Sequence, residues 1–200
     1  VNCGQCAKAC PYSAIQRRKR PCISACKANA ISTGEDGAAH INDEKCITCG
    51  SCVYQCPFGA ISDRSSIVQI IEKLKDTNNH VYAIVAPSIA SQFDYAKVLQ
   101  VVTGIKKLGF YEVVEAALGA DMVAYSEAQE LVEKGELTSS CCPAFVRYIK
   151  RNFPMLAEKI SHNPSPMVAL SRYLKSIDDK AVTVFIGPCT SKKREALETE

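Results

Sequence analysis

The sequence predicts two domains of different classes: a small, cysteine-rich α+β domain over residues 1–63 and an α/β domain over residues 80–200, joined by a linker helix at 64–79. Nine of the 12 cysteines lie between positions 3 and 56, where short, turn-bounded segments predict small hairpin strands and short helices. From residue 80 onward, apolar runs alternate with amphipathic stretches, which is the pattern of a sheet covered by helices.

The elements of the second domain follow from this alternation. Strands are expected at 81–85, 111–115 and 181–186, and helices at 98–108, 119–134, 144–152 and 167–177. Asp63 or Ser65 is placed to cap the linker helix. Because α/β sheets bind ligands where their strands end, we expect a site near Ala86 and Gly187.

The composition excludes several classes of function. A content of 47% hydrophobic and 22% charged residues suits a folded chain. The net charge of +3 is too small to favour binding to nucleic acid or to a membrane surface. No apolar run approaches the roughly 20 residues that span a bilayer. The basic run Arg17, Arg18, Lys19 and Arg20 is interpreted as a solvated loop, with docking of an acidic electron carrier as the alternative. Neither end has the signals of a natural terminus, so we expect a longer protein.

A short pattern, C-x3-A-I, occurs three times in the first 61 residues, beginning at Cys10, Cys26 and Cys56. Repetition at this scale indicates a duplicated iron–sulfur unit. A disulfide framework is the alternative, but cysteines two residues apart can face one metal centre, so the tight spacing favours iron ligation.

One complete iron–sulfur motif, C-x2-C-x2-C-x3-C-P, is formed by Cys46, Cys49, Cys52 and Cys56. In bacterial ferredoxins this spacing places three cysteines on one 4Fe-4S cubane and the fourth on its neighbour. Cys3, Cys6 and Cys10 match the last three cysteines of the same motif, whose first cysteine would directly precede Val1. By the ferredoxin pattern, Cys10 completes the cubane of the first three cysteines of the complete run, and Cys56 joins Cys3 and Cys6 in a second.

Cys22 and Cys26 are left over from this count, because two cubanes need eight thiolates. Three roles are open to them: replacing another ligand, helping to hold a third cluster, or packing as small apolar side chains.

Two segments of the second domain resemble the first two signature motifs of FeFe (iron-only) hydrogenases. They are residues 139–145, with Cys141-Cys142-Pro143, and residues 186–195, with Pro188-Cys189 and Lys192. The resemblance runs over essentially all of the chain and implies a ferredoxin-like 2x(4Fe-4S) domain followed by the first half of the iron-only hydrogenase large-subunit fold. The insertion at Arg20-Pro21-Cys22 resembles a branch distinct from the best-known clostridial enzymes.

The resemblance implies an H-cluster, a 4Fe-4S cubane joined to a two-iron subsite with carbonyl, cyanide and dithiolate ligands. By motif, Cys142 and Cys189 would ligate the cubane, and Cys141 would pass protons to the subsite. Adjacent side chains of an extended loop point opposite ways, which allows this division. The other cofactor-binding residues would be Pro87, Ser88 and Lys192, with Ser88 and Lys192 donating hydrogen bonds to the cyanides.

Proton supply requires a chain of titratable groups that leads to Cys141. Glu127 and Glu130 match the two relay glutamates of the family, and Ser161 matches its relay serine. The two glutamates are three residues apart on a predicted helix, so they share a face.

The chain departs from the familiar enzymes at several positions. Gly187 replaces a Met, and Met167 replaces a polar amide, so rate, bias and oxygen tolerance are in doubt. The third signature motif, which carries two further cysteines, has no counterpart, so we expect this stretch alone to be inactive. His40, His80 and His162 show no metal spacing and are interpreted as structural or exposed.

The predicted function is reversible reduction of protons to H2, with electrons delivered from ferredoxin or a similar carrier through 4Fe-4S clusters. Hydrogenase maturation proteins are the other implied partners, and oxygen-sensitive clusters favour the cytoplasm. The alternative is a non-catalytic relative, either an H2 sensor or an iron–sulfur cluster assembly factor. Cys141 and the glutamate pair favour the enzyme, because a factor that moves no protons needs no relay. A plain electron-transfer protein would leave Cys142, Cys189 and Lys192 unexplained.

Overall fold

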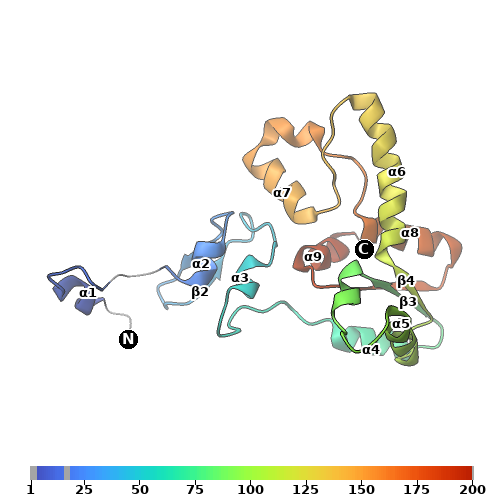
Figure 1. The fold of residues 1–200 in the computed structure, drawn as a ribbon, viewed down its shortest axis with the longest axis horizontal. Helices are drawn as coiled ribbons and strands as arrows, with labels where there is room; N and C mark the ends of the chain where they lie inside the picture. Colours follow the sequence, from blue (N-terminus) through green and yellow to red (C-terminus); the bar gives the residue numbers. More distant parts are fainter. Residues whose placement is uncertain (1–3, 16–18, 200) are drawn as a thin grey trace. The chain divides into compact units, whose positions relative to one another are not determined.

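The structure is a computed structural model, and it describes residues 4–15 and 19–199 (Figure 1). The chain divides into two compact units: Val1–Cys46 with Gly50–Ser62, and Ile47–Cys49 with Asp63–Glu200. Cys3, a predicted cluster ligand, and Arg17 and Arg18 of the basic run interpreted as a solvated loop lie outside the described residues.

The first unit is built from short elements. Among its described residues these are helices α1 (Gln5–Ala9), α2 (Pro21–Ala25) and α3 (Ser51–Tyr54), and strands β1 (Ile31–Thr33) and β2 (Ala39–Ile41). The two strands form an antiparallel hairpin in which Ile31 lies opposite Ile41. This arrangement confirms the predicted small hairpin and short helices. Few apolar side chains are buried here, so an apolar core contributes little to this unit.

The second unit contains the elements of an α/β domain. They are α4 (Ile67–Lys75), β3 (His80–Val85), the 3-10 helix η1 (Pro87–Ser91), α5 (Val98–Lys107), β4 (Glu112–Glu115), α6 (Ala116–Lys134), α7 (Pro143–Asn152), the 3-10 helix η2 (Pro154–Lys159), α8 (Pro166–Ile177), β5 (Ala181–Ile186) and α9 (Thr190–Glu198). The strands form a parallel sheet of order β4-β3-β5. The predicted α/β alternation is therefore confirmed.

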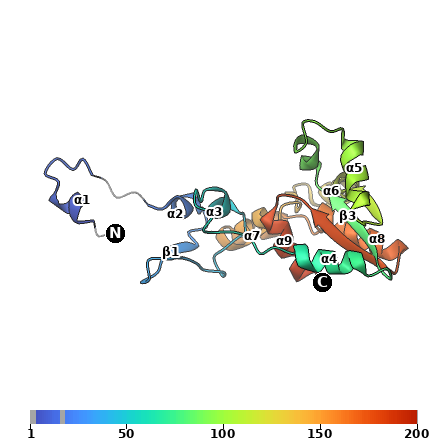
Figure 2. The same cartoon turned by 90° about the horizontal axis from the view of Figure 1, so that it is seen from below.

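The central strand β3 is buried on both faces, as expected for a parallel sheet. On one face, Val81, Ala83 and Val85 pack against α4 and α5. On the other, Tyr82 and Ile84 pack against α6 and α8. Figures 1 and 2 show these two helix pairs on opposite sides of the sheet. This double layer holds the carboxyl ends of the strands in place.

Helix α6 begins three residues earlier than the sequence suggested, at Ala116, with Gly119 inside it. A Cβ atom at Gly119 would lie 2.2 Å from the backbone oxygen of Pro166, at the start of α8. Glycine is therefore needed for the close approach of α6 and α8, and it does not mark a helix boundary.

Two ion pairs join distant segments of the second unit. Asp63 accepts a hydrogen bond from Lys193 Nζ at 2.6 Å. The predicted cap of α4 at Asp63 or Ser65 is wrong: the N-cap residue is Ser66, which makes no side-chain capping bond, although Ser65 Oγ accepts the Ile67 N–H at 3.3 Å. His80 Nδ1 lies 2.6 Å from Asp178 Oδ2, which agrees with a structural role for this histidine. No described helix is both long and apolar enough to cross a bilayer.

Candidate functional site

Two of the predicted cofactor-binding segments follow neighbouring parallel strands. Pro87-Ser88 follows β3, and Pro188-Cys189 follows β5. The Ala86 N–H donates to the Ile186 carbonyl at 2.9 Å, which keeps the two strand ends together. The structure thus places both segments where α/β sheets bind their ligands.

Gly187 sits between these two strand ends with no room for a side chain. A Cβ atom there would lie 2.7 Å from the Phe185 ring and 2.9 Å from the Ala86 Cβ. A Met at position 187 would therefore require the Phe185 ring to move, so the exchange of Met for glycine is coupled to local packing.

Cys142 and Cys189 occupy equivalent places in the fold. Each is the N-cap residue of a helix: Cys142 of α7 and Cys189 of α9. The positive end of each helix dipole therefore lies next to a predicted cluster ligand. Lys192 Nζ donates to the Cys141 carbonyl at 3.1 Å, so the two cysteine motifs lie side by side. This donor set suits a thiolate-ligated iron cluster.

A three-residue stretch of the ferredoxin-type run, Ile47–Cys49, belongs to the second unit. The Thr190 hydroxyl donates to the Thr48 carbonyl at 2.9 Å, and Arg147 Nη1 donates to Thr48 Oγ1 at 2.6 Å. Thr48 precedes Cys49 and Thr190 follows Cys189, so one hydrogen bond joins the neighbours of two predicted ligands.

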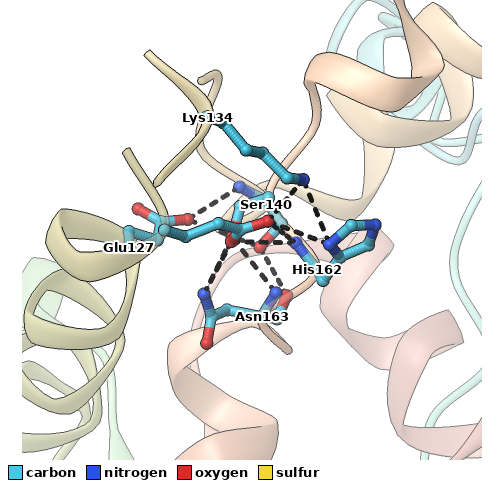
Figure 3. Close-up of polar contacts among 7 residues, drawn as sticks. Glu127, Lys134, Ser140, His162 and Asn163 are labelled. Carbon is cyan, nitrogen blue, oxygen red and sulfur yellow. Dashed lines mark hydrogen bonds and ion pairs between the residues drawn. The ribbon is translucent and has the colours of Figure 1, made fainter. Parts of the chain in front are cut away.

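Glu127 lies beside the loop that carries Cys141 (Figure 3). Its Oε1 accepts hydrogen bonds from Ser139 Oγ at 3.0 Å and from the Ser140 N–H at 3.1 Å. The Cys141 N–H in turn donates to Ser139 Oγ at 3.3 Å. A single serine therefore separates the Glu127 carboxylate from the backbone of the predicted proton-transfer cysteine.

The Glu130 carboxylate accepts hydrogen bonds from four residues, of which Lys134, His162 and Asn163 are labelled in Figure 3. The donors are Ser161 Oγ at 3.0 Å, Asn163 Nδ2 at 3.1 Å, the His162 N–H at 3.2 Å and Lys134 Nζ at 2.7 Å. The hydrogen bond from Lys134 is the main reason that the pKa of Glu130 falls to about 2. Glu130 is therefore ionised at neutral pH.

Backbone pairing brings these distant segments together. Thr138 and Ile160 form a parallel bridge, in which the Thr138 N–H donates to the Lys159 carbonyl and the Ser161 N–H donates to the Thr138 carbonyl. The bridge aligns the cysteine loop with the segment that carries Ser161. It explains why a serine 31 residues after Glu130 reaches that carboxylate.

Sequence reasoning missed three of the residues around Glu130: Lys134, His162 and Asn163. Lys134 could have been found, since it lies one helical turn after Glu130. The His162 side chain is 79% exposed, as expected, but its Nδ1 lies 2.9 Å from Glu130 Oε1. Asn163 gave no signal, because only the bridge between Thr138 and Ile160 places it there.

In the first unit, backbone N–H groups surround cysteine sulfurs. The N–H of Ala14 is the main cause that lowers the pKa of Cys10, and the N–H of Phe58 is the main cause for Cys56. Such bonds stabilise the thiolate, the form that binds iron.

None of the 11 described cysteines forms a disulfide. No three His, Cys, Asp or Glu side chains among the described residues converge on a point suited to a single metal ion. A cubane spreads its four thiolates further apart than a single ion does, so thiols wrapped by N–H groups fit a cluster better than a mononuclear site.

Comparison with known protein families first defines the class as an iron–sulfur protein with hydrogenase-type architecture. Residues 1–60 match the family model of a 4Fe-4S dicluster domain, and residues 79–200 match that of the iron only hydrogenase large subunit, C-terminal domain. The chain belongs to the iron-only hydrogenase large-subunit family.

Individual relatives include both enzymes and an assembly factor. The chain is 32% identical over 157 residues to iron hydrogenase 1 of Clostridium pasteurianum, covering 68% of this chain and 27% of that protein. It is 31% identical over 161 residues to the periplasmic Fe hydrogenase large subunit of Nitratidesulfovibrio vulgaris, covering 68% and 38%. It is also 30% identical over 108 residues to the cytosolic Fe-S cluster assembly factor NAR1 of Candida dubliniensis, covering 48% and 18%.

A solved structure shows the same fold. Apo FeFe-hydrogenase HydA1 from Chlamydomonas reinhardtii superposes with a TM-score of 0.57 at 28% identity, covering 66% of this chain and 40% of that chain. The chain spans less than two fifths of the length of the curated relatives named above.

Proposed function

We propose that the chain carries the electron-transfer domain and part of the hydrogen-activating site of a ferredoxin-dependent FeFe-hydrogenase. The reaction is the reversible reduction of protons to H2, with electrons from ferredoxin or a similar carrier. The observation that carries the proposal is the position of Glu127, whose carboxylate accepts hydrogen bonds from Ser139 and from the N–H of Ser140 in the loop just before Cys141. A carboxylate held by the loop that carries a cysteine is a candidate group for moving protons.

The residues at the strand ends would hold the H-cluster. Cys142 and Cys189 would ligate its cubane, while Ser88, next to Pro87, and Lys192 would donate hydrogen bonds to its diatomic ligands. When bound, this group would supply the redox-active iron at which protons and electrons combine. The Lys192 contact to the Cys141 carbonyl supports the proposal, because it holds a cation beside both cysteine motifs.

Proton entry would use the two glutamates of α6 in series. Glu130 faces the exposed His162, and its other oxygen accepts the Ser161 hydroxyl. Glu127, one helical turn earlier, is bonded to the serines before Cys141. Protons would therefore pass from Glu130 and Ser161 to Glu127, and from there to Cys141.

Electron entry would use the ferredoxin-type cubanes. The hydrogen bond between Thr190 and the Thr48 carbonyl supports this route, since it links the chain next to Cys49 with the chain next to Cys189. No redox chemistry is required of the protein groups themselves on this route.

A second candidate function is iron–sulfur cluster assembly or H2 sensing without turnover. The similarity to the assembly factor of Candida dubliniensis favours it. The ion pair between Lys134 and Glu130 also favours it, because a carboxylate held at a pKa of about 2 is a weak proton acceptor.

The two candidates differ in what Glu127 does. In the matured full-length protein, Glu127→Gln should lower H2 evolution by about 100-fold or more, which is the scale of general acid–base catalysis. Glu133→Gln, an exposed position on the same helix, is the matched control and should retain activity. Cluster signals in electron paramagnetic resonance should be the same in both variants. Equal activity in both variants would contradict the proposed relay.

A further inference from the structure

Cys22 and Cys26 have no role in the site described above, although α2 repeats the local structure of α3. Cys22 and Cys26 stand thirty residues before Cys52 and Cys56, with the same spacing. Each pair begins within a short helix and ends at a cysteine just beyond it. The cysteines of both segments are therefore candidates for ligating iron–sulfur clusters.

The backbone after each helix is also the same. The Cys26 N–H donates to the Ile23 carbonyl as the Cys56 N–H does to that of Val53. The next positive-φ residues, Asn29 at 51° and Gly59 at 61°, occupy equivalent places. Glycine and asparagine are the residues that adopt this conformation most readily, so the same left-handed turn follows Cys26 and Cys56.

This turn aims an N–H group at each sulfur. The Ala30 N–H donates to Cys26 Sγ at 3.2 Å, and the Ala60 N–H donates to Cys56 Sγ at 3.3 Å. Hydrogen bonds to sulfur stabilise thiolates and tune iron–sulfur clusters. A cysteine that packed only as an apolar side chain would have no need of this donor.

The hairpin then fixes Cys26 relative to Cys46. The Asn42 N–H donates to the Ala30 carbonyl at 2.8 Å, and the Cys46 N–H donates to the Asn42 carbonyl at 2.9 Å. Ala30 is four residues after Cys26, and Asn42 is four residues before Cys46. Both cysteines are therefore connected by short segments to the same end of the hairpin, where Ile31 of β1 pairs with Ile41 of β2.

Helix packing places Cys22 on the same side of this unit as the complete run. Helix α2 packs against α3, which carries Cys52. Cys22 is only 7% exposed, in a unit with few buried side chains. The pair on α2 is thus held beside the run by the hairpin and by helix packing.

We propose that α2 supplies two cluster ligands: Cys26 completes the cubane of the run that starts at Cys46, and Cys22 joins Cys56 in the second cubane. Cys26 thereby takes the place that ferredoxin spacing gives to Cys10. The positions thirty residues before Cys46 and Cys49 hold Gln16 and Lys19. The second cubane therefore draws its remaining two thiolates from the N-terminal run that contains Cys10.

Iron content in paired alanine variants tests this assignment independently of H2 chemistry. The full-length protein is loaded anaerobically, and iron per chain is measured for Cys26→Ala, Cys46→Ala and the double variant. Two ligands of one cubane give non-additive losses: each single variant and the double should lack about four iron atoms. Cys22→Ala and Cys56→Ala should show the same non-additivity with each other.

Two controls separate ligand loss from misfolding. Ser24→Ala lies between the two cysteines on α2 and should retain full iron. The cubane left in each single variant should keep its electron paramagnetic resonance signal. Full iron in Cys26→Ala, or additive losses in the double variant, would overturn the assignment. So would non-additivity of Cys10→Ala with Cys46→Ala, since it would return Cys10 to the first cubane.

Discussion

The two units of the chain are stabilised in different ways. In the second, a parallel sheet is covered on both faces, and side chains such as Ala83 and Leu170 are fully buried. In the first, few side chains are buried, and backbone N–H groups point at sulfur atoms. The difference indicates that an apolar core stabilises the second unit, whereas bound iron must supply most of the stability of the first.

Removal of iron should have the largest effect and should separate the two units. Chelation under reducing conditions removes the iron that the thiols bind, so the β1–β2 hairpin should lose its slow hydrogen exchange. Strand β3 and helix α8 should keep theirs. Hydrogen–deuterium exchange with mass spectrometry, comparing loaded and iron-free protein, measures both at once. Unchanged protection of the hairpin would contradict a cluster-dependent first unit.

Leu170→Ala should produce the converse result. Leu170 on α8 is completely buried, so its truncation should destabilise the second unit by about 2 to 5 kcal/mol. The electron paramagnetic resonance signals of the ferredoxin-type clusters, and the iron they hold, should not change, because the first unit does not depend on this core. Leu99→Ala on α5, where the leucine is 78% exposed, is the matched control. Thermal unfolding measures the stability. A loss of the ferredoxin-type clusters in Leu170→Ala would show that the two units are not stabilised independently.

Lys134→Met should give a smaller, pH-dependent effect confined to the second unit. The pKa of Glu130 is about 2 in the folded protein, below the ordinary value of a glutamate, and the hydrogen bond from Lys134 is the largest cause. A lowered carboxyl pKa stabilises the fold above the unfolded pKa, and this contribution is lost as pH falls toward 2. The variant should therefore be less stable by about 1 kcal/mol at pH 7, with the difference shrinking below about pH 4.5.

Urea unfolding between pH 7 and pH 3 measures this dependence, and Lys134→Arg should behave as the unsubstituted protein. A stability difference that stays constant over this range would show that Lys134 does not act through the charge of Glu130.

Local pattern predicted most of the fold. The apolar runs at 81–85 and 181–186 became β3 and β5, because strands buried on both faces are continuously apolar. The start of α6 was wrong by three residues, since Gly119 serves helix packing and local propensity does not reveal a neighbouring helix.

The site was less accessible to sequence reasoning. Motif spacing identified Cys141, Glu127 and Glu130, whose roles remain predictions. The surroundings of Glu130 depend on the bridge between Thr138 and Ile160, a tertiary contact without a local signature. The C-x3-A-I repeat indicated that α2 and α3 are equivalent. The sequence did not predict the hydrogen bond from Ala30 to the Cys26 sulfur, or those that connect Ala30, Asn42 and Cys46, because they depend on the folded hairpin.

Infrared spectroscopy combined with an H2 assay on the matured full-length protein tests the proposed hydrogenase function most directly. The proposal predicts bands of iron-bound carbonyl and cyanide together with H2 evolution from a reduced carrier. In Cys141→Ser the bands should remain, while H2 evolution falls about 100-fold or more. Loaded 4Fe-4S clusters without these bands and without H2 would contradict the proposal and favour a cluster assembly or sensing role.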